Sequence, residues 1–142
     1  MAEPSPHVRA RAPLRLGLAG GGTDLSPYCD RFGGAVLNIT INRHAYAFIE
    51  PSADGRVHLV ARDINLRESF DCDLDALAEA RLAIHAGVYR RMCRDFGGGR
   101  PLALTISSYV DAPPGSGLGS SSALGVALVE AFRSLLALPL GL

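Results

Sequence analysis

The chain has 142 residues, of which 48% are hydrophobic, and a formal net charge of zero at pH 7. This length and composition suit one domain with a buried core, and the neutral charge gives no reason to expect nucleic acid or an acidic membrane as a partner. All 14 basic residues are arginine, which excludes a Walker-type lysine, a Schiff base and a lysine general base.

The cysteines and the apolar segments indicate in which cellular compartment the protein is expected. Cys29, Cys72 and Cys93 are widely spaced, so they fit neither a disulfide framework nor a CxxC metal site. The apolar run near the N-terminus is interrupted by Arg15 and is too short for an export signal. No segment approaches the roughly 20 apolar residues of a membrane span. We therefore expect a soluble, cytoplasmic protein with free thiols that are buried or partly buried.

The first half of the chain predicts a curved antiparallel sheet. Leucines alternate with Arg15 and Gly17 before a glycine-rich turn, and the next apolar runs are rich in β-branched and aromatic residues. Asp54-Gly55 provides the chemistry of a hairpin turn. The predicted strands are 14–20, 35–41, 46–50 and 57–62.

The second half predicts two helices around a strand. Apolar residues recur at three- and four-residue spacings from about 71–75 to Phe96, where Gly97–Gly99 ends the pattern. A strand follows over 101–108. Residues 122–138 then predict a helix that is apolar on nearly every face, and such a helix is expected to be buried on all sides.

The four histidines, His7, His44, His58 and His85, have no metal-ligand spacing. We expect them on the surface or on strand faces.

The segment DAPPGSGLGSSSAL, residues 111–124, connects the last strand to the last helix and has two interpretations. A structural turn needs one serine as a helix cap, worth about 1 kcal/mol. A phosphate-binding loop needs glycines that let the backbone approach a ligand, and free N–H groups at a helix N-terminus. Three glycines precede Ser120–Ser122 here, which favours phosphate binding, and Pro113 and Pro114 make a flexible linker a poor description.

PPGSGLGSSSAL resembles the central ATP-phosphate motif of the GHMP kinases, the superfamily of galacto-, homoserine, mevalonate and phosphomevalonate kinases. In that family the loop holds the triphosphate by backbone N–H groups and needs no lysine. The resemblance implies ATP and Mg²⁺ as cofactors and Ser121 as the hydroxyl nearest the metal. The implied ATP-binding residues are Pro114, Gly115, Ser116, Gly117, Leu118, Gly119, Ser120, Ser121 and Ser122.

APLRLGLAGGGTDL, residues 12–25, is similar to the family's N-terminal substrate motif. Gly21 and Gly22 replace the Glu-His pair of galactokinases, which argues against galactose. Together with GGAVLNITIN, this form more closely resembles the members that act on heptose 7-phosphate, and fucokinase-like members share parts of it. The implied substrate-binding residues are Gly21, Gly22, Thr23 and Asp24.

Two residues of this motif also have interpretations that rest on their chemistry alone. Asp24 can accept hydrogen bonds from sugar hydroxyls, or it can form an Asx turn or cap. Arg15 can offset the charge that develops in phosphoryl transfer, or it can be an exposed strand arginine.

The resemblance implies an α+β fold like the second domain of ribosomal protein S5, a mixed sheet with helices packed on one side. It makes residues 1–142 an incomplete GHMP kinase N-terminal, ATP-binding domain, with the family's catalytic aspartate and C-terminal domain beyond it. The chain is then a fragment, a truncated gene product or a degenerate paralogue. We expect exposed apolar surface and self-association.

The expected function is ATP-dependent phosphorylation of a sugar or sugar phosphate, heptose 7-phosphate at the anomeric hydroxyl in the form closest to the motifs. The alternative is an inactive nucleotide- or sugar-binding remnant. A third possibility, an S5-like module joining another chain or nucleic acid, is disfavoured by the neutral charge.

Overall fold

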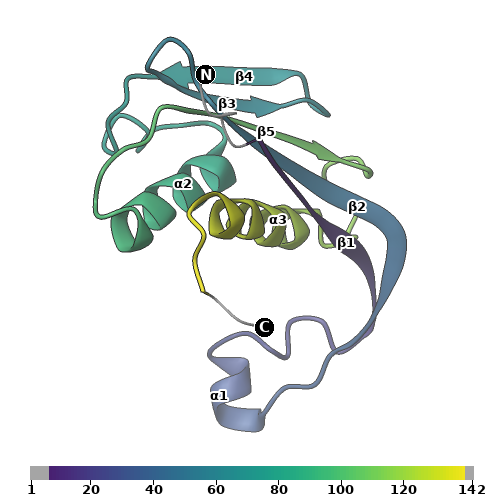
Figure 1. Cartoon of the computed structure of the whole chain (residues 1–142). Helices are drawn as coiled ribbons and strands as arrows, with labels where there is room; N and C mark the ends of the chain where they lie inside the picture. Colours follow the sequence, from purple (N-terminus) through teal and green to yellow (C-terminus); the bar gives the residue numbers. More distant parts are fainter. Residues whose placement is uncertain (1–6, 140–142) are drawn as a thin grey trace.

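A five-stranded sheet in the order β1-β2-β5-β3-β4 carries its two long helices on one side (Figure 1). The computed structural model describes residues 7–139. The elements are β1 (Val8–Ala19), α1 (Tyr28–Phe32), β2 (Leu37–Pro51), β3 (Val57–Ala61), β4 (Leu66–Phe70), α2 (Ala83–Phe96), β5 (Leu104–Val110) and α3 (Ser120–Leu135).

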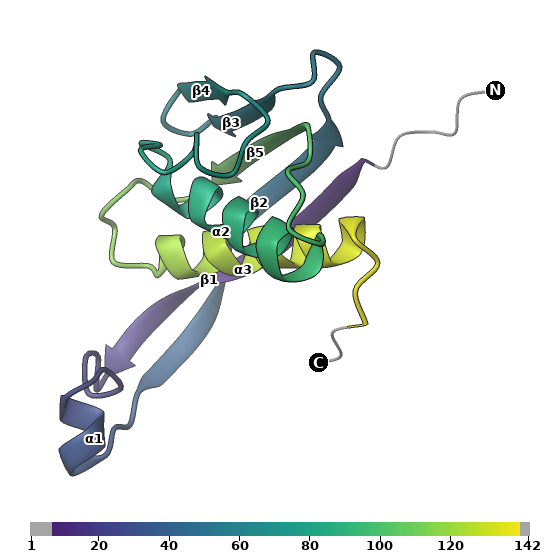
Figure 2. The ribbon, with the colours of Figure 1, turned by 90° about the vertical axis from the view of Figure 1, so that its left-hand side faces the viewer.

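The sheet is mixed, because β3 and β5 run parallel while the other neighbours are antiparallel. β2 pairs with β5 over Ala45–Pro51 and with β1 along nearly its whole length. The far ends of β1 and β2 leave the body of the domain as a two-stranded arm with α1 at its tip (Figure 2). The predicted α+β class, with a mixed sheet and helices on one side, is confirmed.

Small side chains on the sheet bring α3 close to it. Ala10 and Ala12 of β1 and Ala45 and Ala47 of β2 are buried, and α3 packs over these two strands. α2 packs beside α3, where the rings of Tyr89 and Phe132 meet edge to face with centroids 6.2 Å apart. The core therefore lies between one face of the sheet and a single layer of helices.

Two strand predictions are wrong in detail. Residues 35–41 and 46–50 were expected as separate strands, but β2 is continuous over Leu37–Pro51. Between the two predicted strands, His44 lies opposite Pro13 of β1, and the pairing has an irregularity before it resumes at Thr40 opposite Arg15. The strand after the Asp54-Gly55 turn was also expected to pair with the strand before it, but β5 lies between β2 and β3 and pairs in parallel with β3. Finally, β4 was not predicted. Its five residues alternate only partly buried side chains, and its pairing with β3 defines it.

The helix boundaries differ because tertiary contacts set them. α2 begins at Ala83 rather than near 71–75, where the carboxylate of Glu68 on β4 accepts hydrogen bonds from the backbone N–H groups of Arg81 (2.9 Å) and Leu82 (2.8 Å). α3 runs from Ser120 to Leu135 and not over 122–138.

The expectation that α3 is buried on every side is also wrong, since Val126 is 62% exposed and Val129 is exposed beside it. Within the described residues, no helix is long and apolar enough to cross a membrane.

Candidate functional site

The serine-rich loop, residues 111–122, passes through Gly119, the residue that precedes the first turn of α3. Gly119 has φ +69° in the left-handed region and caps the helix without any side-chain hydrogen bond. Gly115 and Gly117 also have positive φ, +77° and +73°. No serine serves as the cap, so the N–H groups of the first turn remain available to a ligand. An uncapped helix N-terminus behind a glycine loop is a favourable place for an anion.

Arg15 of β1 contacts this loop through its backbone and its side chain. Its N–H donates to the carbonyl of Leu118 at 2.9 Å. A Cβ built on Gly119 would lie 3.0 Å from Cγ and 3.1 Å from Nε of Arg15, so the side chain lies directly against the glycine. Asn38 of β2 accepts a hydrogen bond from the guanidinium at 2.9 Å. The structure thus brings the arginine of the first motif to the loop of the second.

The three serines face different surroundings. Ser120 and Ser121 line a cavity of about 330 Å³. Ser122 instead borders a shallow groove on the outer side of α3, with Val126 and Val129. A rotation of about 100° per helical residue separates consecutive side chains, which explains why the triplet is divided between two sides of the helix.

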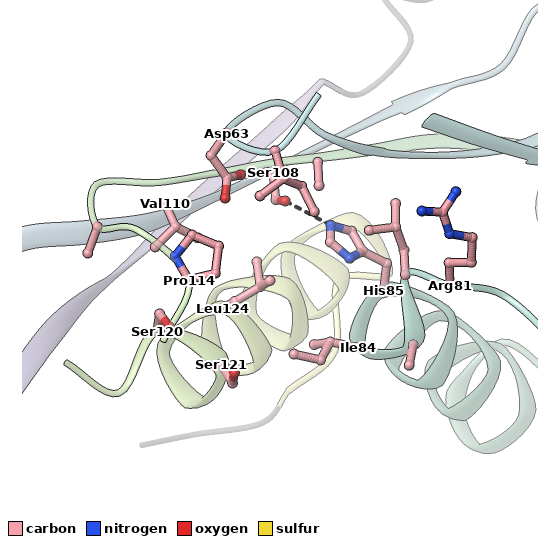
Figure 3. Close-up of a pocket in the computed structure, with 15 residues that line it drawn as sticks. Asp63, Arg81, Ile84, His85, Ser108, Val110, Pro114, Ser120, Ser121 and Leu124 are labelled. Carbon is pink, nitrogen blue, oxygen red and sulfur yellow. Dashed lines mark hydrogen bonds between the residues drawn. The ribbon is translucent and has the colours of Figure 1, made fainter. Parts of the chain in front are cut away.

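The cavity lies between the start of α2, the end of β5 and the start of α3, and its wall is mainly apolar (Figure 3). The β3–β4 turn contributes Asp63 and Ile64, and α2 contributes its first turn. Its size falls in the range of small-ligand sites, which are typically apolar with a few placed polar groups. The lining residues are Ala61, Asp63, Ile64, Arg81, Leu82, Ala83, Ile84, His85, Ser108, Val110, Ala112, Pro114, Ser120, Ser121 and Leu124.

His85 is a cavity residue that the sequence did not reveal. It was expected on the surface or on a strand face, but it lies in the first turn of α2 and is only 2% exposed. Its Nε2 lies 2.8 Å from the hydroxyl oxygen of Ser108 on β5. Burial lowers the pKa of His85 to about 4, against the opposing charges of Asp63 and Glu68. The ring is therefore neutral at pH 7.

The predicted substrate-binding residues, Gly21 to Asp24, lie on the arm. Thr23 fixes the loop: its hydroxyl donates to the carbonyl of Gly20 (2.7 Å) and accepts from the N–H of Ala35 (3.1 Å). Gly20 has φ +76°, and a Cβ there would overlap the carbonyl of Ala35. Thr23 and the glycines therefore shape the loop before they contact any ligand.

Asp24 is exposed, and its carboxylate makes no hydrogen bond or ion pair with any residue between 7 and 139. The alternative role as an Asx turn or cap is not observed in this conformation. Gly21, Gly22 and Asp24 do not line the cavity. Residues 7–139 also contain no group of three His, Cys, Asp or Glu side chains placed to hold a metal ion.

Comparison with known proteins agrees with this geometry. A family model for the N-terminal domain of GHMP kinases matches residues 77–142, which include α2 and the serine-rich loop. The D-glycero-alpha-D-manno-heptose 7-phosphate kinase of Campylobacter jejuni is 40% identical over 134 residues, covering 94% of this chain and 39% of the relative. The second half of the chain therefore matches the N-terminal domain of GHMP kinases, and nearly the whole chain is similar to members of that superfamily.

Solved structures of GHMP kinases extend the likeness to nearly the whole fold. The crystal structure of a D-glycero-D-manno-heptose 1-phosphate kinase from Bacteriodes thetaiotaomicron matches with a TM-score of 0.85 and 46% identity, over 94% of this chain and 44% of that one. The galactokinase of Lactococcus lactis, complexed with galactose, shares the fold with a TM-score of 0.69 at 21% identity, over 95% and 34%. The present chain thus spans about two fifths of the length of its heptose kinase relatives.

Proposed function

We propose that this chain forms the nucleotide-binding half, and part of the sugar site, of an ATP-dependent kinase that phosphorylates heptose 7-phosphate at its anomeric hydroxyl. The observation that carries the proposal is the contact of Arg15 with Gly119, which joins the two motifs at an uncapped helix N-terminus. The identity of 40% and 46% to heptose kinases supports the sugar class.

The ATP phosphates would lie on the loop from Pro114 to Ser122. Backbone N–H groups of the first turn of α3 would donate to the phosphate oxygens, and the helix dipole adds favourable charge. The nucleoside would occupy the adjoining cavity, whose apolar wall suits a flat ring. The loop and the cavity share Pro114, Ser120 and Ser121, so one ligand can fill both.

Mg²⁺ fits this arrangement through a single protein oxygen. Ser121 is exposed on the first turn of α3 and lines the cavity, so its hydroxyl can reach a cation held by the phosphates. Bound Mg²⁺ would neutralise charge on the β- and γ-phosphates during transfer. Arg15 would add a second positive charge at Gly119, where its side chain already lies.

The sugar would be held by the arm. The free carboxylate of Asp24 can accept hydrogen bonds from sugar hydroxyls, and Gly21 and Gly22 leave room for a polyol to approach the backbone. Catalysis would depend mainly on holding the hydroxyl in line with the γ-phosphate and on electrostatic stabilisation. We place this reaction in the cytoplasm, where the free thiols of the described chain suit the reducing conditions.

Binding of Mg·ATP to the 142-residue chain tests the proposal, and the serine triplet supplies a matched pair of variants. Ser121→Ala should weaken Mg·ATP binding about tenfold or more, because an oxygen on the cation is lost. The same variant should leave ATP binding in excess EDTA unchanged. Ser122→Ala should leave both unchanged, since Ser122 would contribute only its backbone N–H to the phosphate site and borders the outer groove. Isothermal titration calorimetry measures each constant.

Absence of Mg·ATP binding at millimolar concentration would refute the nucleotide site. Equal effects of Ser121→Ala and Ser122→Ala would refute the metal role alone. A phosphoryl-transfer assay with ATP and heptose 7-phosphate then separates a kinase from the alternative, a binding remnant. A bisphosphorylated heptose product identifies the kinase and excludes the remnant.

A further inference from the structure

His85 presents an unpaired ring nitrogen to the cavity beside the serine-rich loop. Nε2 is paired with Ser108, and Nδ1 has no hydrogen-bond partner among residues 7–139. Among the same residues, Nε of Arg90 is the one side-chain nitrogen or oxygen that is buried from solvent and has no hydrogen-bond partner. Nδ1 of His85 is therefore not sealed inside the protein. Since the ring lines the cavity, this nitrogen borders its open space.

The partner on β5 determines which ring nitrogen carries the proton. The Ser108 residue is 1% exposed, and the His85 ring is the partner that its hydroxyl has in the described structure. If Nε2 donated to Ser108, the hydroxyl hydrogen would be buried without an acceptor. If the hydroxyl donates to Nε2, both groups are satisfied. The second arrangement leaves the proton on Nδ1.

The ring keeps this arrangement at neutral pH. Burial lowers the pKa of His85 to about 4, so the imidazole carries one proton and has one donor nitrogen. Figure 3 shows the imidazole on the first turn of α2, joined to Ser108 across the wall of the cavity. Ser108 thus fixes the ring orientation from the sheet, and Nδ1 is left to donate to a ligand in the cavity.

We propose that His85 is a specificity-determining residue for the nucleotide, donating a hydrogen bond from Nδ1 to an acceptor nitrogen of a purine ring in this cavity. The inference rests on the proposed function, because it needs a nucleoside next to the phosphate loop. A donor in a mainly apolar wall selects strongly, because a ligand without the acceptor leaves a buried polar group unpaired. Ser108 acts as a positioning residue that holds the tautomer.

Deaza analogues of ATP test the hydrogen bond one atom at a time. In 1-deaza-, 3-deaza- and 7-deaza-ATP, a C–H replaces one acceptor nitrogen and the triphosphate is unchanged. One of the three should bind the native chain about tenfold or more weakly than ATP, and the other two should bind within about threefold of it. His85→Phe should remove the difference between that analogue and ATP.

Two further variants separate recognition from folding. His85→Gln retains an N–H donor and should keep part of the discrimination, and urea unfolding of each variant checks the fold. His44→Phe is the control, since His44 lies on β2 and does not line the cavity, and its analogue profile should match the native one.

The outcomes distinguish the inference from the proposed function. Tight ATP binding with equal affinities for all three analogues would overturn the role of His85 and leave the nucleotide site standing. A discrimination that persists undiminished in His85→Phe would also overturn it, because another group would then contact the ring nitrogen. No binding of ATP would overturn both.

Discussion

Gly119 combines a backbone requirement with a side-chain contact. Its φ of +69° lies in the left-handed region, and Arg15 packs against it at 3.0 Å from the position of a Cβ. Gly125, six residues further along the chain and inside α3, has nothing within 4 Å of its own Cβ position. The structure therefore requires glycine at position 119, whereas α3 leaves room for a Cβ at position 125.

Alanine substitutions should reveal this difference. Gly119→Ala should lower the free energy of unfolding by about 1–2 kcal/mol, the cost of a left-handed conformation for a residue with a Cβ. Gly125→Ala should raise it by about 0.5–1 kcal/mol, because alanine favours a helix interior. Urea denaturation at 25 °C measures both. Equal effects of the two changes would show that the backbone at Gly119 relaxes freely.

The buried His85 makes stability depend on pH. Its folded pKa of about 4 lies below its unfolded value of 6.5, so the unfolded chain binds more protons between these values. The contribution of His85 to the free energy of unfolding is therefore complete above pH 6.5. It is lost as the pH falls toward 4, by about 3 kcal/mol in total. His85→Gln should flatten the stability profile over this window.

Urea midpoints at pH 7 and pH 4.5 measure the effect for the native chain and the variant. Asp54 acts in a different window: its hydrogen bond from Ser52, together with those from Arg56 and His58, lowers its pKa, so its contribution is lost only below about pH 4. Matching profiles for native and His85→Gln would contradict the assignment to His85.

At the scale of elements, the start of α2 depends on β4. The N-cap position, Leu82, has no side-chain hydrogen bond of its own, and Glu68 supplies the acceptor from the neighbouring strand. This contact holds the first turn of α2, and with it His85, against the cavity. A helix boundary set from another strand leaves no capping signal in the local sequence.

Removing this acceptor should destabilise the domain. Glu68→Ala should lower the free energy of unfolding by about 1–2 kcal/mol, the range for loss of a helix cap. Glu79→Ala is the control, since Glu79 is exposed and has no bond to another described residue, and surface changes of this kind stay within about 0.5 kcal/mol. Thermal and urea denaturation check both. A Glu68→Ala effect no larger than that of Glu79→Ala would contradict the capping role.

The sequence could predict features that depend on local patterns, but not features that depend on contacts between distant segments. The serine-rich loop and the first motif are local patterns, so their residues, the α+β class and most strands could be identified directly. His85 could not, because its burial and its pairing depend on Ser108, 23 positions away on a different element. The start of α2 and the existence of β4 depend in the same way on contacts across the sheet.

At the scale of the whole molecule, several exposed apolar side chains of the described residues lie in two groups. On the arm, Phe32 is 73% exposed and Leu25, Leu37 and Ile39 are exposed with it. On the outer side of α3, Val126 and Val129 border the shallow groove. Exposed patches of this kind mark interaction surfaces or aggregation risks.

We expect the 142-residue chain to self-associate as its concentration rises into the micromolar range. Replacing both valines, Val126→Asp with Val129→Asp, should shift sedimentation toward the monomer, because charge disfavours burial of that face. Phe96→Asp should not, since Phe96 is exposed at the end of α2 and does not line the groove of Val126 and Val129. A single monomeric species at all concentrations would contradict the expectation.

The bond between Arg15 and Leu118 also limits how this site can be transplanted. The serine-rich loop is a short contiguous segment, and its sequence suggests that it could be grafted onto another scaffold together with its helix. Yet its carbonyl at Leu118 is held by the backbone of β1, and its last glycine is covered by a side chain of the same strand. A graft of residues 111–124 without β1 would therefore keep the sequence of the motif but lose the conformation of the loop. The smallest transferable unit is the loop, its helix and the first strand together.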